Sequence, residues 1–305
     1  MRTRMEQNRG IIVKGTGGLY DVLLDGGERI SCRAKGIFRL DDMKPTVGDR
    51  VSVASDGLDG YVISEISERK NLIVRPPLAN LDCLFITVPS YRPSPDYYTV
   101  DKLSAIAVHN GIKPIIVATK CLLDARVAED TAAIYRGVFP VFVTDAVEGI
   151  GTDGLKEFIK SSCGGKISAF AGASGAGKST LMNALFDHLS LGTGEVSAHT
   201  GRGKHTTRTA ELFPADGNAL IADTPGFTML DFERFDFFTL EDLPAAFPEI
   251  NEHIRSCRYT KCTHRKEEGC KVLEALEKGE ISASRHESYK SLYEILKNKH
   301  AWDKK

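Results

Sequence analysis

Apolar and polar positions follow three different patterns along the chain, and the first predicts a small β domain. Over residues 9–66, short β-prone stretches at 20–24, 29–34, 50–53 and 61–66 are separated by turns rich in Gly and Asp. This spacing predicts a five-stranded β-barrel of the OB-fold type, although a β-sandwich or an SH3-like barrel gives much the same pattern. The residues Arg75, Pro76 and Pro77 then interrupt the pattern and indicate a linker.

The second pattern begins after the linker and predicts an α/β domain. Continuous apolar runs, which are typical of strands buried on both faces, occur at residues 83–88, 114–119, 141–144, 167–171 and 219–223. Helix-like segments lie between several of them, as at 99–109 and 155–160, and this alternation favours a doubly wound sheet.

The third pattern starts after residue 231, where the chain becomes helical and polar and contains a cluster of Cys and His residues. It predicts a small helical domain stapled by a metal ion. We therefore expect a multi-domain α/β protein: a barrel over 1–70, a linker over 71–79, an α/β domain over 80–231 and a metal-binding helical domain over 232–305.

Composition limits the cellular setting of the chain. The 305 residues carry 40 basic and 41 acidic side chains and a formal net charge of −1, so any RNA contact must use local patches rather than an overall positive field. The N-terminus lacks the apolar core of a signal peptide, and no run approaches the roughly 18 apolar residues that span a bilayer. We expect a cytoplasmic protein without a membrane partner, whose scattered cysteines are buried, reduced thiols.

A phosphate-binding motif of the form GxxxxGK[ST] follows the apolar run 167–171 and precedes a helix-like stretch. Its glycines let backbone N–H groups turn toward phosphates, Lys178 can bridge the β- and γ-phosphates, and Ser179 can ligate Mg²⁺. The competing interpretation is a Gly-rich turn with an exposed lysine. The predicted nucleotide contacts are Gly172, Ala173, Ser174, Gly175, Ala176, Gly177, Lys178, Ser179 and Thr180.

Two further segments fit a triphosphate site. Asp223 and Gly226 form an Asp-x-x-Gly pattern after the apolar run 219–222, where the carboxylate can hold Mg²⁺ and the glycine N–H can sense the γ-phosphate. Between the two motifs, the glycines and hydroxyls of 201–207 suit a mobile loop in which Thr206 or Thr207 ligates the same Mg²⁺. An ordinary polar loop is the alternative for this stretch.

The candidate base-reading box precedes the phosphate motif instead of following it. Thr119, Lys120 and Leu122 end the apolar run 114–119, and the next run is followed by Asp145 and Ala146, which resemble the short box that supports guanine. The order of the motifs is thus circularly permuted, which a sheet tolerates because strand pairing does not depend on where the chain begins.

The residues Cys257, Cys262, His264 and Cys270 form a C-x4-C-x-H-x5-C pattern. Three thiolates and one imidazole within fourteen residues suit a closed tetrahedral zinc site, and with four protein ligands the zinc is structural. Free cysteines beside an exposed histidine are the alternative. Basic residues surround the cluster and either contact RNA phosphates or solvate the domain: Arg255, Arg258, Lys261, Arg265, Lys266 and Lys271.

These features together resemble the circularly permuted GTPases of the ribosome-small-subunit-dependent GTPase A family, also called RsgA or YjeQ. The resemblance covers nearly the whole chain and includes 201–207, 223–227, and Arg285 with Tyr289 in the last helix. It implies an OB-fold, a permuted GTPase domain and a zinc domain. It also implies that GTP hydrolysis, slow in the protein alone, is accelerated by the small ribosomal subunit late in the assembly of that particle.

The resemblance also assigns catalytic candidates. Phe227 stands where many GTPases carry a glutamine that orients water, so another group must do this. His205 is the family-like candidate, acting beside Lys178 and Thr207, although a loop histidine can equally be a solvated bystander.

The chain departs from the family pattern in the base box. Where the box should read Asn-Lys-x-Asp, the chain has Thr119 and Leu122, and the carboxylate that accepts both guanine N–H groups is absent. Asp124 lies two residues further on and can substitute if the loop is remodelled, while Lys120 can still pack its stem along the base.

Three functions follow from these observations. The first is a monomeric GTPase that uses Mg²⁺ with GTP and one structural Zn²⁺, and that switches between GTP and GDP on the small ribosomal subunit and its rRNA. The second is a nucleotide-gated ribosome- or RNA-binding module with little turnover, motivated by Phe227 and the altered box. The third is a nucleoside triphosphatase with relaxed base preference, motivated by Leu122.

Overall fold

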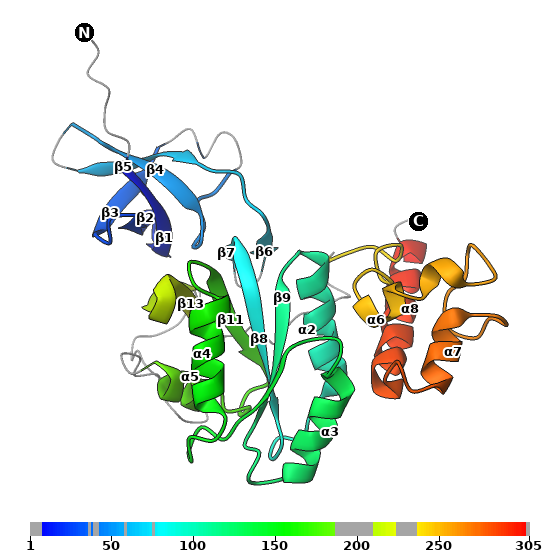
Figure 1. Ribbon diagram of the computed structural model, residues 1–305. Helices are drawn as coiled ribbons and strands as arrows, with labels where there is room; N and C mark the ends of the chain where they lie inside the picture. The colour runs from blue at the N-terminus through cyan, green and yellow to red at the C-terminus, as the bar shows by residue number, and fades with distance from the viewer. Residues whose placement is uncertain are drawn as a thin grey trace. The chain divides into compact units, whose positions relative to one another are not determined.

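The computed structural model describes residues 8–35, 38, 43–57, 60–74, 77–186, 210–223 and 237–302. The chain divides into two compact units. One comprises the described residues of 8–83, 159–170 and 210–223, and the other those of 84–158, 171–186 and 237–302. Figure 1 labels most of the helices and strands.

The N-terminal strands close into a barrel, drawn in blue in Figure 1. They are β1 (Asn8–Thr16), β2 (Leu19–Leu24), β3 (Arg29–Ala34), β4 (Arg50–Ser55) and β5 (Tyr61–Ile66), in the order β1-β2-β3-β5-β4. The β3–β5 pair is parallel, and the other pairs are antiparallel. Ile12, Val22 and Ile63 are fully buried, because alternate residues of a barrel strand face its interior. The predicted OB-like barrel is confirmed.

The segment that the sequence assigns to a linker is more regular than expected. It forms an antiparallel pair of strands, β6 (Leu72–Val74) and β7 (Pro77–Ala79), although a proline run there predicts irregular structure. The pair forms because Ile73 and Leu78 bury their apolar side chains, at 4% and 0% exposure. Burial of these two side chains outweighs the local effect of the prolines.

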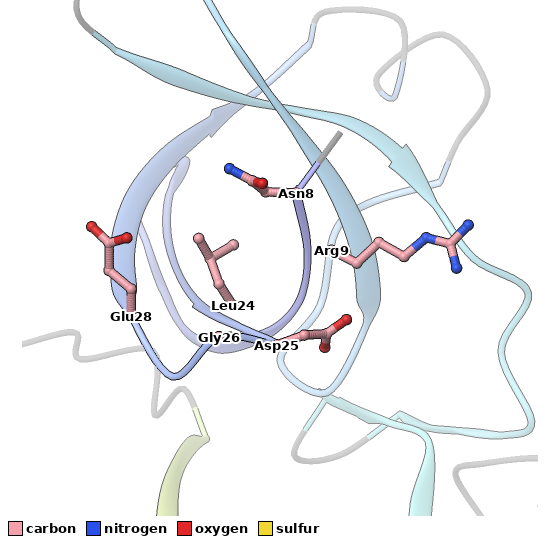
Figure 2. A pocket seen from close by; sticks show the side chains of 6 residues that line it. All are labelled: Asn8, Arg9, Leu24, Asp25, Gly26 and Glu28. Carbon is pink, nitrogen blue, oxygen red and sulfur yellow. The ribbon is translucent and has the colours of Figure 1, made fainter. Parts of the chain in front are cut away.

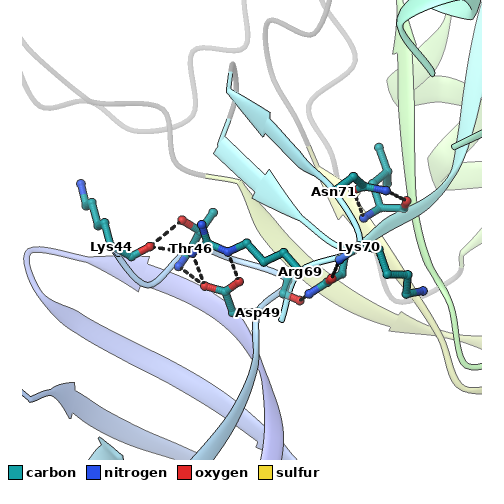
Figure 3. Close-up of polar contacts among 9 residues, drawn as sticks. Lys44, Thr46, Asp49, Arg69, Lys70 and Asn71 are labelled. Atoms are coloured by element: carbon teal, nitrogen blue, oxygen red, sulfur yellow. Dashed lines mark hydrogen bonds and ion pairs between the residues drawn. The ribbon is translucent and has the colours of Figure 1, made fainter. Parts of the chain in front are cut away.

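A polar network joins the last barrel strands to this pair (Figure 3). The Arg69 guanidinium donates from Nε to Asp49 Oδ1 at 2.7 Å and from Nη2 to Asp49 Oδ2 at 2.8 Å. Asp49 is fully buried and also accepts the Thr46 N–H. Asn80 Nδ2 donates to the Gly48 carbonyl at 2.9 Å. A buried carboxylate is satisfied here by a bidentate arginine, which fixes the loop before β4.

The remaining strands form one six-stranded sheet in the order β10-β9-β8-β11-β13-β12. They are β8 (Leu81–Pro89), β9 (Lys113–Thr119), β10 (Val141–Val143), β11 (Ile167–Gly172), β12 (Glu211–Ala215) and β13 (Ala219–Asp223). The pairs β9–β10 and β11–β13 are parallel, whereas β12 is antiparallel to β13 across the short turn η1 (Asp216–Asn218). Every predicted apolar run became a strand of this α/β sheet.

Helices follow the strands as the alternation predicts. They are α2 (Tyr97–His109), α3 (Ala125–Tyr135), α4 (Thr152–Ser162) and α5 (Lys178–Leu185). Two of them begin at aspartate caps, because Asp96 accepts the Thr99 N–H and Asp124 accepts the Val127 N–H. The cap at Asp124 bears directly on the base box described below.

The C-terminal part, orange to red in Figure 1, is helical as predicted. It consists of α6 (Pro248–Asn251), η2 (Ile254–Ser256), α7 (Lys271–Glu277) and α8 (Ala283–Trp302). Tyr289, Leu292 and Leu296 are at most 3% exposed, so the helical spacing of these residues marks a packing face. Among the described residues, the helices are too short or too polar to cross a membrane.

Candidate nucleotide site and metal cluster

The predicted phosphate loop lies between β11 and α5. Its glycines adopt backbone angles that side chains disfavour: φ is +142° at Gly172, +74° at Gly175 and +85° at Gly177. A Cβ at Gly172 would lie 2.1 Å from Thr87 Oγ1. The motif therefore needs glycine at its first position because β8 lies close, as well as for the turn itself.

Lys178 begins α5 and folds back over the loop. Its Nζ donates to the carbonyls of Gly172 at 2.6 Å and Ala173 at 2.9 Å. The ammonium is thus held over the loop at the N-terminus of an eight-residue helix. A positive charge, the helix dipole and glycine backbone together form an anion-binding environment.

Thr87 supports the loop from the neighbouring strand and was not identified from the sequence. Its hydroxyl donates to the Ala171 carbonyl at 2.9 Å and is fully buried. A single threonine within the apolar run 83–88 was the available signal, because a buried hydroxyl requires a partner.

Residues 119–123, which begin at the last residue of β9 and carry the predicted base box, form a loop that we call the base loop, and it contacts the phosphate loop. Thr119 Oγ1 donates to the Ala176 carbonyl at 2.7 Å. The Lys120 stem passes the same turn, since a Cβ at Gly177 would stand 3.8 Å from Lys120 Cε. Lys120 Nζ donates to the Arg92 carbonyl at 2.6 Å. The structure therefore brings Thr119 and Lys120 to the phosphate loop, although Thr119 and Ala176 are 57 positions apart in the chain.

The Asp145 carboxylate of the predicted base site accepts hydrogen bonds from nearby backbone N–H groups. Asp145 Oδ1 accepts the Val147 N–H at 3.2 Å, and its Oδ2 accepts the Leu122 N–H at 3.4 Å. Ala146 is the next residue in this turn, which closes by an isolated bridge between Asp145 and Ile150. Leu122 is 56% exposed. Asp145 thus links the turn after β10 to the base loop.

Asp223 ends β13 at the carboxyl edge of the parallel pair β11–β13. Ala222 pairs with Ala169 of β11, and Glu211 of β12 is the register partner of Asp223 itself. Four other predicted site residues, His205, Thr206, Thr207 and Gly226, lie outside the described residues, so their roles stay predictions.

The four predicted metal ligands come together in the helical part. Their ligand atoms all lie within 4.8 Å of one another. Cys257 Sγ is 3.5 Å from His264 Nδ1 and 4.0 Å from Cys270 Sγ, and Cys270 Sγ is 3.6 Å from the same nitrogen. Ligands of a tetrahedral ion with bonds of about 2.0–2.3 Å lie about 3.5–3.8 Å apart, so the residues fit such a metal ion.

Neighbouring groups hold the cluster in shape. Glu267 accepts the backbone N–H groups of Thr263, Arg265 and Lys266 at 2.8–3.1 Å. Burial raises the pKa of Glu267, but its hydrogen bonds, led by the Thr263 side chain, outweigh burial and hold this pKa well below its ordinary value. The carboxylate therefore acts as a charged clamp on the turn that presents His264.

A pocket of about 460 Å³ opens at the barrel (Figure 2). It is lined by Asn8, Arg9, Leu24, Asp25, Gly26 and Glu28. Leu24 points inward while Arg9 points away from the barrel. One arginine and two carboxylates give the lining no positive excess for a phosphate group, and we assign this pocket no ligand.

Comparison with protein families gives two matches. Residues 66–233 match the RsgA GTPase family. Residues 9–62 match the RsgA N-terminal domain. Together they cover nearly all of the barrel and the whole of the predicted α/β domain.

Curated relatives match over nearly their whole length. The small ribosomal subunit biogenesis GTPase RsgA of Halalkalibacterium halodurans is 40% identical over 298 residues, covering 96% of this chain and 98% of the relative. The protein of the same name from Thermotoga maritima is 38% identical over 296 residues, covering 95% and 97%.

Solved structures agree with the sequence matches. The crystal structure of YjeQ from Thermotoga maritima superposes with a TM-score of 0.81 at 34% identity, covering 95% of this chain and 98% of that one. The structure of YloQ, described as a circularly permuted GTPase, gives a TM-score of 0.78 at 32% identity and covers 98% of both chains. The permuted order inferred from the motifs is therefore confirmed.

Proposed function

This chain belongs to the RsgA GTPase family, and from that premise we propose that it hydrolyses GTP as a nucleotide-dependent switch in late maturation of the small ribosomal subunit. The observation that carries the proposal is the phosphate loop with Lys178 folded over it and Thr119 hydrogen-bonded to it. This arrangement supplies backbone and cationic donors for a triphosphate next to a loop suited to a base.

The phosphate loop binds and orients the β- and γ-phosphates in this proposal. Lys178 leaves the Gly172 and Ala173 carbonyls and donates to phosphate oxygens instead, a stronger charge-assisted contact. Ser179 and Asp223 would hold Mg²⁺ together with Thr206 or Thr207, and the ion would supply positive charge beside the transferred phosphoryl group.

Water activation is assigned to the segment 201–207. His205 orients the attacking water once Thr207 and its neighbours close over the γ-phosphate. Phe227 cannot do this, because its side chain has no polar group that could orient water. Gly226 senses the γ-phosphate through its N–H. Loss of the phosphate then releases the segment, which is the switching step.

The metal cluster and its basic surface are proposed to hold a structural zinc ion and to contact rRNA. Four protein ligands close the coordination sphere, and three soft thiolates favour zinc over harder cations. Arg258, Arg265 and Lys271 have acidic partners. Arg255, Lys261 and Lys266 are exposed and have no side-chain ion pair within the described residues, so these three are the phosphate contacts we propose.

A phosphate-release assay separates this function from a ribosome-binding module with little turnover. The chain, with Mg²⁺ and GTP, is assayed with and without purified small ribosomal subunits. We expect slow release that the subunits accelerate, by a monomeric protein of the cytoplasm. Release that stays at the background rate with subunits present, while GTP still binds, would favour the binding module.

Two lysine variants control for protein quality. Lys178→Ala should abolish nucleotide binding, whereas Lys160→Ala, which removes an exposed lysine of α4, should leave binding and release unchanged. Equal loss in both variants would contradict the assignment of the phosphate loop.

A further inference from the structure

We propose that the base site of this chain does not read the 2-amino group of guanine, so that it binds guanosine and inosine nucleotides with similar affinity. The inference rests on the proposed function, since it concerns the base of the nucleotide whose phosphates the loop holds. The expected substrates are then guanosine and inosine nucleotides, which a base box without an aspartate at position 122 does not distinguish.

The base loop is held where it can contact a base. The Thr119 hydroxyl anchors it on the Ala176 carbonyl at 2.7 Å, and the Lys120 stem runs beside Gly177. Lys120 has φ of +58° and is anchored through Nζ to the carbonyls of Tyr91 and Arg92. Lys120 is held at one end of this stretch, and the Leu122 N–H is held by Asp145. A base that lies along the Lys120 stem would therefore face Leu122 and its neighbours.

Those residues offer no side-chain acceptor. Leu122 and Leu123 are 56% and 61% exposed, and neither can accept a hydrogen bond. Guanine presents an N1–H and a 2-amino group on one edge, and recognition of both donors requires an acceptor such as a carboxylate. Leucine at this place leaves both donors to water.

Asp124 does not replace the missing carboxylate. It is the N-cap of α3, where its Oδ1 accepts the Val127 N–H at 3.1 Å. Turning it toward a base would uncap the helix, which costs about 1 kcal/mol. The aspartate nearest to Leu122 in the sequence therefore caps α3 and does not serve as the base acceptor.

The turn after β10 does not replace it either. Asp145 accepts the N–H groups of Leu122, Val147 and Glu148, and these bonds hold the two loops together. Glu148 is exposed, and its side chain has no hydrogen bond or ion pair within the described part of the chain. A glutamate that no contact positions would lose rotamer freedom worth about 1.5–2 kcal/mol on binding.

Inosine tests this inference because it differs from guanosine only by the 2-amino group. A site built around a hydrogen bond to that group would penalise its loss strongly, since the acceptor would be left buried without a partner. A site without the acceptor has nothing to leave unpaired. The dissociation constants of GDP and IDP should therefore agree within about threefold, since no bond worth the usual 1–3 kcal/mol is lost.

The experiment measures binding of GDP and IDP to the full chain with Mg²⁺ by calorimetry, so that hydrolysis does not interfere. Leu122→Asp should create a preference for GDP of about tenfold or more, the ratio that a hydrogen bond to a charged group provides. Leu123→Asp is the matched control, because it adds the same charge at a leucine of similar exposure, one position beyond the place where the Asn-Lys-x-Asp box carries its carboxylate, and it should leave the ratio near one.

The outcomes separate this inference from the proposed function. A wild-type preference for GDP over IDP of tenfold or more would overturn the inference while leaving the GTPase intact. Loss of such a preference in Glu148→Gln would then identify Glu148 as the acceptor. Equal gains in Leu122→Asp and Leu123→Asp would also overturn it, and failure to bind any nucleotide would overturn the proposed function itself.

Discussion

Arg285 of α8 donates a hydrogen bond from Nη1 to Asp101 Oδ1 of α2 at 2.7 Å, across 184 positions of sequence, and both side chains are fully buried. Glu249 accepts two further bonds from the same guanidinium. Burial acts to lower the pKa of Arg285, but the carboxylates of Glu249 and Asp101 outweigh it, and the pKa lies above its ordinary value. This charged group joins the helical part to α2 within one compact unit.

Asp101 is further held by Tyr135 of α3, whose hydroxyl donates to the same Oδ1 at 2.9 Å. The Arg285 guanidinium also lies 5.0–5.5 Å from the ring centroids of Tyr135, Phe139 and Phe247. Burial raises the pKa of Asp101, and Arg285 opposes that rise. The network is therefore sensitive to removal of its single cation.

Arg285→Met should destabilise the chain severely. The substitution leaves Asp101 and Glu249 buried without their cation. Removing one partner of a buried ion pair typically costs about 3–5 kcal/mol, so the free energy of unfolding should fall by this amount. Urea unfolding followed by circular dichroism measures the effect. Glu287→Gln on the same helix removes a pair in which Glu287 is 68% exposed, so it should change the free energy by less than about 1 kcal/mol. Similar midpoints for the two variants would show that the buried network does not stabilise the fold.

Thr119→Val should weaken nucleotide binding and also lower the stability of the fold. Valine keeps the shape of threonine but removes the hydroxyl, so the base loop loses its bond to the buried Ala176 carbonyl. The nucleotide must then order a base loop that is no longer held in place, and a cost of about 1 kcal/mol for this ordering raises the dissociation constant of GDP roughly fivefold, measured by calorimetry. Thr119→Ser keeps the donor and should bind like wild type. If serine and valine weaken binding equally, the hydroxyl is not the anchor.

Gly48→Ala should destabilise the barrel far more than alanine at an open glycine. Gly48 has φ of +92°, and a Cβ there would lie 2.1 Å from the Ala79 carbonyl oxygen, which belongs to backbone and cannot swing away. Gly17 has φ of +62° with no atom within 4 Å of a Cβ, so Gly17→Ala meets only the backbone penalty of about 1 kcal/mol. Thermal unfolding compares the two. Equal losses would mean that the close approach to Ala79 is not a constraint.

The cluster of Cys257, Cys262, His264 and Cys270 should hold one zinc ion per chain. Zinc content by mass spectrometry should be one ion per chain, and Cys262→Ser should lower it well below one, because a thiolate ligand is lost. Cys121→Ser changes a buried cysteine of the base loop that is not in the cluster, and its zinc content should match wild type. Full zinc occupancy in Cys262→Ser would remove this residue from the ligand set.

The glycine geometry of the phosphate loop, the metal cluster and the N-terminal strands could be predicted from sequence because their determinants are neighbours along the chain, whereas closure of the barrel depends on the distant pairs β1–β4 and β3–β5. Gly172, Gly177 and Lys178 lie within one turn, and the backbone angles of a glycine loop and the start of a helix depend mainly on adjacent residues. The four metal ligands fall within fourteen residues. Alternation along strands likewise reveals which side chains are buried.

Only the tertiary structure decided how distant residues use their polar groups. The sequence offers Asp124 as a substitute base acceptor, whereas in the structure its side chain caps α3. The sequence does not pair Thr119 with Ala176, or Arg285 with Asp101, because such contacts depend on which strands and helices lie side by side. Hydrogen bonds and buried charges act over a few ångströms of space, and packing alone sets that proximity for residues far apart in the chain.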